Sequence, residues 1–176
     1  MHRPASEVER LYSEVAGEYG GALERLARAY EADADRRRDL LQEIHVALWR
    51  SLAGFDGRCS MRTWVYRVAH NVATSRVIRA KERTLLFVDA VTLESIPDTS
   101  DGVAMVDRER TLDRVYALIR QLRPIDRQIM LLYLEDVDAP TIAEVTGMTA
   151  RNVATKIHRI KQVLARRFHD RGADHE

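Results

Sequence analysis

The stretch DAPTIAEVTGMTARNVATKIHRIKQVL, residues 138–164, has the spacing of a helix-turn-helix unit. Asp138 can cap a short helix over residues 139–146, because its carboxylate accepts hydrogen bonds from the free N–H groups of a first turn. Gly147 follows where the chain must turn with a positive φ angle. Thr149 can then cap a second helix. The stretch therefore predicts two helices joined by a tight turn.

The second helix of this unit has an apolar and a polar face. A buried stripe is predicted at helical spacing by Val153, Ile157, Ile160 and Leu164. The opposite face suits the major groove of DNA, where Arg reads guanine and Asn reads adenine. The residues expected to contact DNA there are Arg151, Asn152, Thr155, Lys156, His158 and Arg159. The alternative is an ordinary helical hairpin with a solvated polar face.

Outward from this unit, apolar residues recur every three or four positions, which predicts an all-α fold. Helices are expected over residues 6–31, 39–52 and 61–83, from about Thr111 to Leu122, and again from Pro124. The first of these contains three glycines that can bend or break it, namely Gly17, Gly20 and Gly21. Residues 54–60, with two glycines, are expected to form a loop.

The helical period fails between about residues 84 and 108. IPDTSDG, residues 96–102, has the composition of a flexible linker. LLFVDAV, residues 85–91, has a β-like composition but is too isolated to form a sheet. We therefore expect two small helical domains, residues 6–84 and 111–170, joined by an acidic linker over residues 85–110, with the helix-turn-helix in the second domain.

Composition excludes several classes of protein. The chain has 176 residues and 45% hydrophobic content, with no apolar run long enough to span a membrane and no signal-peptide core at its start. Cys59 is the single cysteine, so an internal disulfide is impossible and a cytoplasmic setting is expected. No metal-ligand spacing, phosphate-binding glycine loop or nucleophile motif is present. We expect no enzymatic activity, no cofactor, no metal and no membrane contact.

The net charge of +1 conceals two basic segments on either side of an acidic one. Residues 58–83 contain seven basic residues and one acidic, and residues 151–171 contain the same numbers. Residues 84–113, between them, contain two basic residues and seven acidic. Two separate basic segments of equal strength predict two contacts with a polyanion.

The first basic segment includes RTWVYRVAHNVATSR, residues 62–76, which mixes aromatic rings with cations. Unpaired nucleic acid favours both, since bases stack on rings and phosphates attract cations. An amphipathic helix with a buried Trp is the alternative. The loop FDGRCSMR, residues 55–62, adds groups that could form a pocket for a base removed from the stack. The residues expected to contact this strand are Phe55, Arg58, Ser60, Arg62, Trp64, Arg67, His70, Asn71, Thr74 and Arg79.

Two long segments resemble one protein family. DLLQEIHVALWRSLAGFDGRCSMRTWVYRVAHNVATSRVIR, from residue 39, is similar to the promoter-melting domain of bacterial RNA polymerase sigma factors of the extracytoplasmic-function (ECF) group. LRPIDRQIMLLYLEDVDAPTIAEVTGMTARNVATKIHRIKQVLARR, from residue 122, resembles their C-terminal domain. The resemblance covers residues 7–167 and includes both domains in the family's order.

The resemblance implies roles for these segments. It implies that the helix starting at Asp39 docks on core RNA polymerase through Asp39, Gln42, Glu43 and Trp49, although Trp49 taken alone could equally be a core residue. It implies that residues 55–79 capture the non-template strand of the −10 element, with Asn71 contacting a base, and that residues 151–161 read the −35 element. It also implies promoter DNA and an anti-sigma factor as partners.

Two features depart from the family pattern, and two other functions stay open. Ser75 stands where the family often has an acidic residue, and Arg36, Arg37 and Arg38 form an unexpected basic run before Asp39. One alternative is a stand-alone helix-turn-helix regulator that binds duplex DNA without polymerase. The other is a sigma-like adaptor that binds polymerase or a regulator but no DNA.

Overall fold

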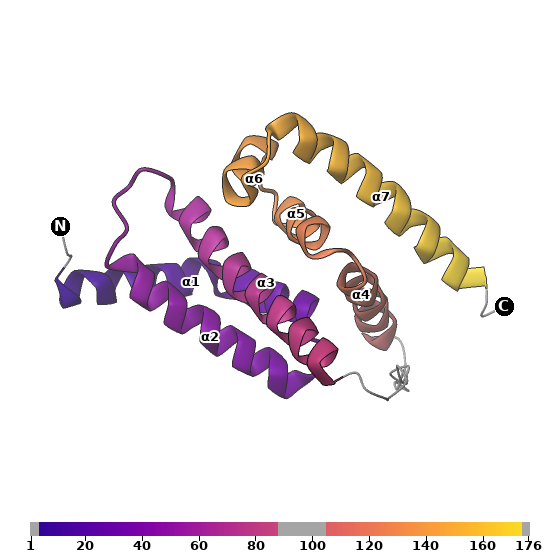
Figure 1. The fold of residues 1–176 in the computed structure, drawn as a ribbon, viewed down its shortest axis with the longest axis horizontal. Coiled ribbons are helices and arrows are strands. Elements are labelled where there is room, and N and C mark those ends of the chain that lie inside the picture. The colour runs from indigo at the N-terminus through magenta and orange to yellow at the C-terminus, as the bar shows by residue number, and fades with distance from the viewer. Residues whose placement is uncertain (1–3, 88–104, 174–176) are drawn as a thin grey trace.

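Helices make up nearly all of the chain that the computed structural model describes, which is residues 4–87 and 105–173, and this part contains no strand (Figure 1). The helices are α1 Ala5–Tyr30, α2 Ala34–Leu52, α3 Met61–Phe87, α4 Met105–Arg120, α5 Pro124–Leu134, α6 Ala139–Thr146 and α7 Ala150–Ala173. The all-α prediction is confirmed. Of the segment LLFVDAV, the first three residues belong to α3 and the rest lies outside the described residues, as does IPDTSDG.

The N-terminal domain consists of α1, α2 and α3, with α1 and α2 packed side by side and α3 lying across α2 (Figure 1). Its core is built from side chains that are fully buried, including Leu23 of α1, Leu40 and Ile44 of α2, and Val65 of α3. Burying each such chain contributes about 1.5–3 kcal/mol relative to leaving it in water. The core therefore depends on the helical spacing found in the sequence.

Helix α1 runs without a break through Gly17, Gly20 and Gly21. Each glycine costs a helix about 1 kcal/mol relative to alanine. None of the three belongs to the buried face, which includes Val15 and Tyr19. Packing of that face outweighs the cost, so the helix is not broken at these glycines.

Helix α2 begins at Ala34, earlier than the predicted Asp39. The side chain of Asp33 accepts a hydrogen bond of 2.9 Å from the backbone N–H of Arg36 and so caps the first turn. The basic run of residues 36–38 is therefore part of this helix. The sequence prediction relied on apolar periodicity, which starts only at Leu40, and so missed the cap.

The C-terminal domain contains the predicted helix-turn-helix in α6 and α7. Asp138 accepts the N–H of Thr141 at 2.8 Å, and Thr149 Oγ1 accepts the N–H of Asn152 at 3.3 Å. Gly147 ends α6 with φ 72°, in the left-handed region. Both caps and the turn are confirmed. In the predicted apolar stripe, Val153 and Ile160 are buried and the other two are half-buried.

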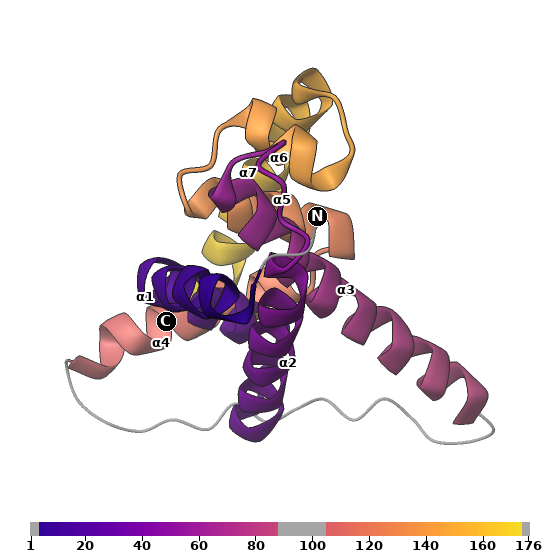
Figure 2. The same ribbon diagram turned by 90° about the vertical axis from the view of Figure 1, so that its left-hand side faces the viewer.

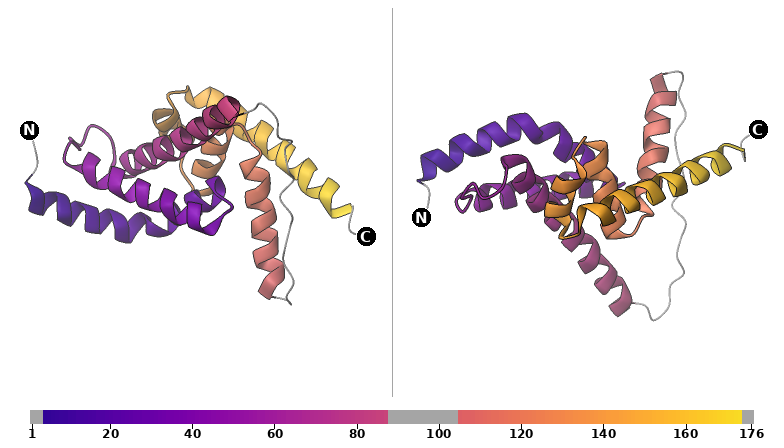
Figure 3. Two further views of the ribbon diagram at one scale, coloured as in Figure 1. Left: turned by 60° about the horizontal axis from the view of Figure 1, so that its bottom comes forward. Right: turned by 90° about the horizontal axis from the view of Figure 1, so that it is seen from above.

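The two domains pack directly against each other. Helix α3 contacts α5 and α6, and α1 contacts α4. Figure 2 shows α5, α6 and α7 stacked above the N-terminal helices, and Figure 3 shows α7 extending away from them toward the C-terminus. Side chains cross the boundary: Ile119 and Leu131 join the N-terminal core, whereas Ala22 and Tyr66 join the C-terminal core.

Candidate nucleic-acid interface

Phe55 and Trp64 form an aromatic pair at the base of the loop that precedes α3. Their ring centroids lie 5.3 Å apart in an edge-to-face arrangement. The indole N–H of Trp64 donates a hydrogen bond of 3.1 Å to Ser51 Oγ. Both residues are half-buried, so the pair anchors the loop while part of each side chain stays accessible to a base.

Two further predicted contacts in this loop have different surroundings. Arg58 is exposed and pairs with Asp56 at 2.6 Å across a turn in which Gly57 has φ 76°. Ser60 Oγ accepts a hydrogen bond of 3.0 Å from the N–H of Thr63, which caps the first turn of α3. Arg58 can exchange an exposed carboxylate for a phosphate, whereas Ser60 already has a structural role.

Arg62 and Arg67, on the first half of α3, both reach the C-terminal domain. Arg62 donates a short hydrogen bond to the backbone carbonyl of Glu135, which follows the last residue of α5. Arg67 donates to the backbone carbonyl of Glu144 in α6 at 3.0 Å. Each guanidinium thus has a partner in the C-terminal domain, with Arg62 exposed and Arg67 half-buried, and the sequence predicted both as contacts to DNA.

His70 was predicted on the exposed face of α3, and the structure corrects this. Its side chain is only 1% exposed and lies between Tyr30 and Tyr66, with the Tyr30 hydroxyl 3.4 Å from Nδ1. Burial lowers the pKa of His70 from its ordinary 6.5 to about 3, because the charged imidazolium cannot be hydrated there. His70 is therefore a neutral core residue.

The burial of His70 reflects a rotation of the buried face of α3. At about 100° per residue, the sequence predicts a core stripe of Met61, Val65, Val68 and Val72, with Arg67, His70, Asn71 and Thr74 on the opposite, polar face. Of the core stripe only Val65 is fully buried, and the buried face is completed instead by Thr63, Tyr66, Ala69, His70 and Ala73. Helix α3 is covered on more than one side, by α1, α2 and the C-terminal domain. A single amphipathic stripe therefore could not describe it.

Asn71, Thr74 and Arg79 follow along α3. Asn71 and Arg79 are exposed and line a groove between α2 and α3. Thr74 is half-buried, with its hydroxyl 3.5 Å from that of Tyr30. Two of these three predicted strand contacts thus face an accessible surface.

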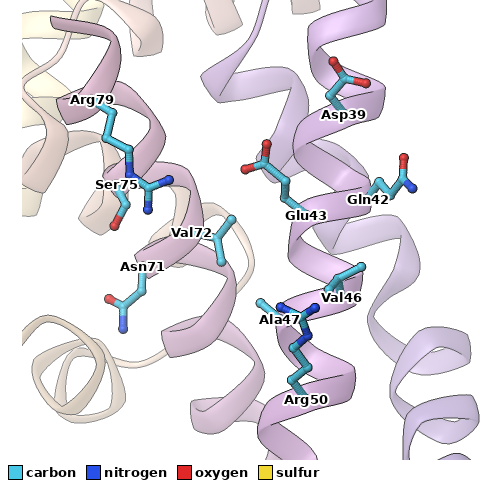
Figure 4. Close-up of a pocket in the computed structure, with 10 residues that line it drawn as sticks. All are labelled: Asp39, Gln42, Glu43, Val46, Ala47, Arg50, Asn71, Val72, Ser75 and Arg79. Atoms are coloured by element: carbon cyan, nitrogen blue, oxygen red, sulfur yellow. The ribbon is translucent and has the colours of Figure 1, made fainter. Parts of the chain in front are cut away.

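The α2–α3 groove has a volume of about 700 Å³ and joins two predicted sites (Figure 4). From α2 it is lined by Asp39, Gln42, Glu43, Val46, Ala47 and Arg50, and from α3 by Asn71, Val72, Ser75 and Arg79. Three of the four residues expected to bind polymerase therefore share a groove with two of those expected to bind DNA. Glu43 is already held at 2.7 Å by Arg76, which also pairs with Glu31.

Val46 and Trp49 give the exposed side of α2 an apolar character. Their exposures are 42% and 40%, so Trp49 is not a core residue. Its ring meets that of Tyr12 edge to face, with centroids 5.3 Å apart. Val46 was missed by the sequence analysis. Its signal was an apolar side chain three residues from Trp49 on a face that is otherwise polar, which is typical of a docking surface.

The recognition face of α7 is open. Five of the six residues predicted there are exposed, namely Arg151, Asn152, Thr155, His158 and Arg159. The hydroxyl of Thr155 donates to the carbonyl of Arg151 at 3.0 Å, and His158 lies 3.0 Å from the amide of Gln162. Both contacts stay within the helix. The face is therefore presented as one continuous polar strip.

Lys156 is the exception on α7. Its ammonium lies 2.7 Å from the carboxylate of Asp126 on α5, and Asp126 also accepts from Arg123 at 3.0 Å. Burial raises the pKa of Asp126, but the hydrogen bonds from Lys156 and Arg123 outweigh it and hold the pKa below its ordinary value. Lys156 thus ties the recognition helix to α5, which the sequence could not reveal.

Neither a metal-binding cluster nor a membrane-crossing helix is found in the part of the chain that the structure describes. Within residues 4–87 and 105–173, no group of three or more His, Cys, Asp or Glu side chains is placed to hold a metal ion. Over the same residues, no helix combines the length and the apolar character that crossing a membrane requires.

Comparison with protein families finds two matches in this order along the chain. Sigma-70 region 2 matches residues 15–84, and Sigma-70 region 4 matches residues 112–164. The first contains α2 and the predicted strand-binding part of α3, and the second contains the helix-turn-helix.

Similar proteins are found over nearly the full length. The ECF RNA polymerase sigma factor SigW of Bacillus subtilis is 21% identical, over 90% of this chain and 89% of its own. The RNA polymerase sigma factor CnrH of Cupriavidus metallidurans is 27% identical, over 92% and 88%.

Two solved structures have a similar fold. One is CnrH in complex with the cytosolic domain of CnrY, with a TM-score of 0.66 and 20% identity over 94% of this chain and 95% of that one. The other is the sigma factor RpoE in complex with the anti-sigma factor NepR from Bartonella quintana, with a TM-score of 0.69 and 18% identity over 87% and 93%.

Proposed function

This chain belongs to the sigma-70 family of RNA polymerase sigma factors, within the ECF group, and on that premise we propose how its two domains divide the work of promoter recognition. It is an alternative sigma factor that directs transcription from specific promoters. The observation that carries the division of work is the pair of basic helices, α3 and α7, placed in separate domains. Each presents cations and hydrogen-bonding side chains of a kind that suits DNA.

Helix α7 reads the −35 element. Its exposed strip offers Arg151 and Asn152 near the start of the helix, where a recognition helix contacts base edges in the major groove. The arginine suits guanine and the asparagine suits adenine. Arg159, further along the same exposed strip, supplies a cation for a phosphate. Lys156 has a structural role instead, because its ammonium donates a hydrogen bond to Asp126 on α5.

Helix α3 and its preceding loop bind the −10 element as a single strand. The half-buried pair Phe55 and Trp64 supplies rings for stacking, Arg58 supplies charge, and Asn71 supplies a hydrogen-bonding side chain. Stacking on an aromatic ring returns about 1–3 kcal/mol per base. This offsets the few kcal/mol needed to unstack a base from the duplex.

Core RNA polymerase docks on the exposed side of α2. Val46 and Trp49 supply apolar area there, and Asp39 and Gln42 supply a polar edge along the α2–α3 groove. An apolar centre with a polar rim is the usual composition of a protein interface. Its position beside Asn71 couples polymerase binding to the strand-binding site.

An anti-sigma factor and a cytoplasmic location complete the proposal. The two similar solved structures are complexes with CnrY and with the anti-sigma factor NepR. We infer that this chain also binds an anti-sigma factor. Sigma factors are not enzymes, and we assign no catalysis to this chain.

The test is run-off transcription from a genomic DNA library with purified core polymerase, with and without this protein. Discrete new start sites that share a pair of upstream elements are expected. No new starts, together with duplex binding by the protein alone, would favour the stand-alone regulator. No starts and no DNA binding would favour the adaptor.

A further inference from the structure

The last turn of α2 and the first turn of α3 are joined by the loop of residues 53–60 (Figure 1). Ser51 lies in that last turn of α2 and is half-buried. Its hydroxyl oxygen has two partners, the carbonyl oxygen of Leu48 at 3.0 Å and the indole nitrogen of Trp64 at 3.1 Å. A single side chain of α2 therefore contacts the ring that we assign to stacking on the −10 strand.

The donor and acceptor roles in this contact follow from the chemistry of the two groups. A serine hydroxyl has one hydrogen to donate and two lone pairs with which to accept, whereas an indole has a single N–H donor and no acceptor. Ser51 donates its hydrogen to the carbonyl of Leu48, and its lone pairs accept the indole N–H of Trp64. The orientation of the hydroxyl is therefore set within α2, and the polar edge of Trp64 has a partner before any DNA is bound.

Phe55 restrains the same indole ring from a second direction. Its ring meets that of Trp64 edge to face, with centroids 5.3 Å apart. The backbone N–H of Phe55 donates to the carbonyl of Leu52 at 3.2 Å. The backbone N–H of Gly54 donates to the carbonyl of Ser51 at 3.0 Å. Both rings of the pair are thus anchored to the last turn of α2, one through the backbone and the other through a side-chain hydroxyl.

The occupied N–H limits what Trp64 can contribute at the strand. Because Ser51 already accepts its only donor, the indole cannot donate to the edge of a base without giving up that bond. The half-buried ring surface remains, and an aromatic ring stacks on any base. Trp64 therefore contributes affinity for an unpaired strand without selecting its sequence. Asn71, exposed further along α3, keeps a hydrogen-bonding side chain for a base.

Restraining the ring in advance lowers the cost of binding. A side chain that becomes immobilised at an interface loses rotational freedom, and this loss reduces the affinity. In the free protein the ring of Trp64 is already restrained by Ser51 and Phe55. When the competent orientation is only one of several, the apparent affinity falls in proportion to its population. Removing the restraint should therefore weaken stacking even though no group that touches DNA is lost.

We propose that Ser51 is a positioning residue for the −10 strand, whose hydroxyl holds the indole ring of Trp64 in the orientation that stacks on an unpaired base. This inference rests on the proposed function in one respect, the assignment of Trp64 to stacking. Ser51 itself touches no base. It lies two residues after Trp49 on α2, so the helix on which polymerase docks also sets the orientation of the stacking ring.

The test uses the full-length protein and a matched set of variants. Ser51→Ala removes the hydroxyl without weakening α2, because alanine favours a helix more than serine does. Ser51→Thr keeps a hydroxyl and is expected to restore the behaviour of the wild type. Ser13→Ala is the control for the loss of a serine hydroxyl, because Ser13 is exposed on α1. Trp64→Leu removes the stacking ring itself.

The first readout is the mobility of the Trp64 ring in the free protein. It is measured by time-resolved fluorescence anisotropy in a Trp49→Phe background, in which Trp64 is the only tryptophan. Ser51→Ala is expected to enlarge the fast component of the anisotropy decay. Ser51→Thr and Ser13→Ala should leave that component unchanged.

The second readout is DNA affinity, measured with native Trp49 on holoenzyme assembled from purified core polymerase and each variant. The probe is a promoter fragment from a start site identified by run-off transcription, with its non-template −10 strand left unpaired. Ser51→Ala is expected to weaken binding about fivefold, the factor that corresponds to one net hydrogen bond of about 1 kcal/mol. Ser51→Thr should restore the affinity, and Ser13→Ala should not change it. Circular dichroism checks that each variant is folded.

The variants separate failure of this inference from failure of the proposed function. Equal affinities of Ser51→Ala and Ser13→Ala, with Trp64→Leu weakened, would overturn the role of Ser51 and leave the stacking role of Trp64 in place. A loss in Ser51→Ala that Ser51→Thr does not restore would also overturn it, because the hydroxyl would not be responsible. Wild-type affinity in Trp64→Leu would overturn the stacking role and the role of Ser51 with it. The absence of start sites in run-off transcription would remove the proposed function and this inference together.

Discussion

The ammonium of Lys156 on the recognition helix lies 2.7 Å from the carboxylate of Asp126 on α5, and this ion pair holds α7 against α5. Asp126 is 8% exposed, so its carboxylate depends on Lys156 and Arg123 for its hydrogen bonds. A buried carboxylate that loses a hydrogen-bond donor destabilises the folded state, because water cannot reach it to replace the lost hydrogen bond.

Lys156→Ala is therefore expected to lower the free energy of unfolding by about 1–3 kcal/mol. The measurement is urea denaturation followed by circular dichroism. Arg159→Ala is the matched control, since Arg159 is an exposed cation one turn further along α7. It should change stability by no more than about 0.5 kcal/mol. Equal losses in both variants would contradict the role given to Lys156.

Arg151→Ala is expected to alter promoter recognition without altering stability. The side chain is exposed, so stability should stay unchanged while base preference in the −35 element is relaxed. Losing one good bidentate contact reduces discrimination against a wrong base by about 1–3 kcal/mol. Transcription from a promoter library randomised at the −35 element measures this. A preference identical to that of the wild type would remove Arg151 from the reading surface.

Asn71 and Trp49 allow the two functions of the N-terminal domain to be separated. Asn71→Ala is expected to reduce promoter opening, measured by permanganate reactivity of unpaired thymines, with core polymerase binding intact. Trp49→Ala removes an apolar group that is 40% exposed on α2 and is expected to weaken core binding. Loss of core binding in Asn71→Ala would show instead that the α2–α3 groove is a single polymerase site.

Much of the C-terminal domain could be predicted because its signals are local. The caps at Asp138 and Thr149 and the positive φ at Gly147 involve residues within four positions of one another. The start of α2 was missed although its signal is also local, since the Asp33 cap precedes the apolar pattern. Capping hydrogen bonds of this kind can be predicted from the sequence, because donor and acceptor lie only three or four positions apart.

The α3 surface could be predicted only in part because distant residues decide it. Arg62 and Arg67 have partners more than 70 positions away, at Glu135 and Glu144. The polar face assigned by helical period placed His70 beside Arg67, but the side chain packs between tyrosines. A prediction from helical period assumes that a helix has one buried face. Helix α3 packs against α1, α2, α5 and α6, so more than one of its faces is buried.

His70 should make stability depend on pH in the acid range. Burial lowers its pKa to about 3, whereas the unfolded chain keeps the ordinary 6.5. Between these values the unfolded state binds a proton that the folded state does not, so stability falls as pH decreases below 6.5. The expected loss from this residue between pH 6.5 and about pH 5 is about 1.5 kcal/mol.

His70→Gln removes the titrating group while keeping a polar side chain, so its unfolding free energy should fall less steeply over that range. Urea denaturation at a series of pH values gives the comparison. His158→Gln is the control for the loss of a histidine, because His158 is exposed on α7. If His70→Gln and the wild type lose stability in parallel, protonation of His70 does not limit the folded state, and the imidazole must accept a proton without leaving its place between Tyr30 and Tyr66.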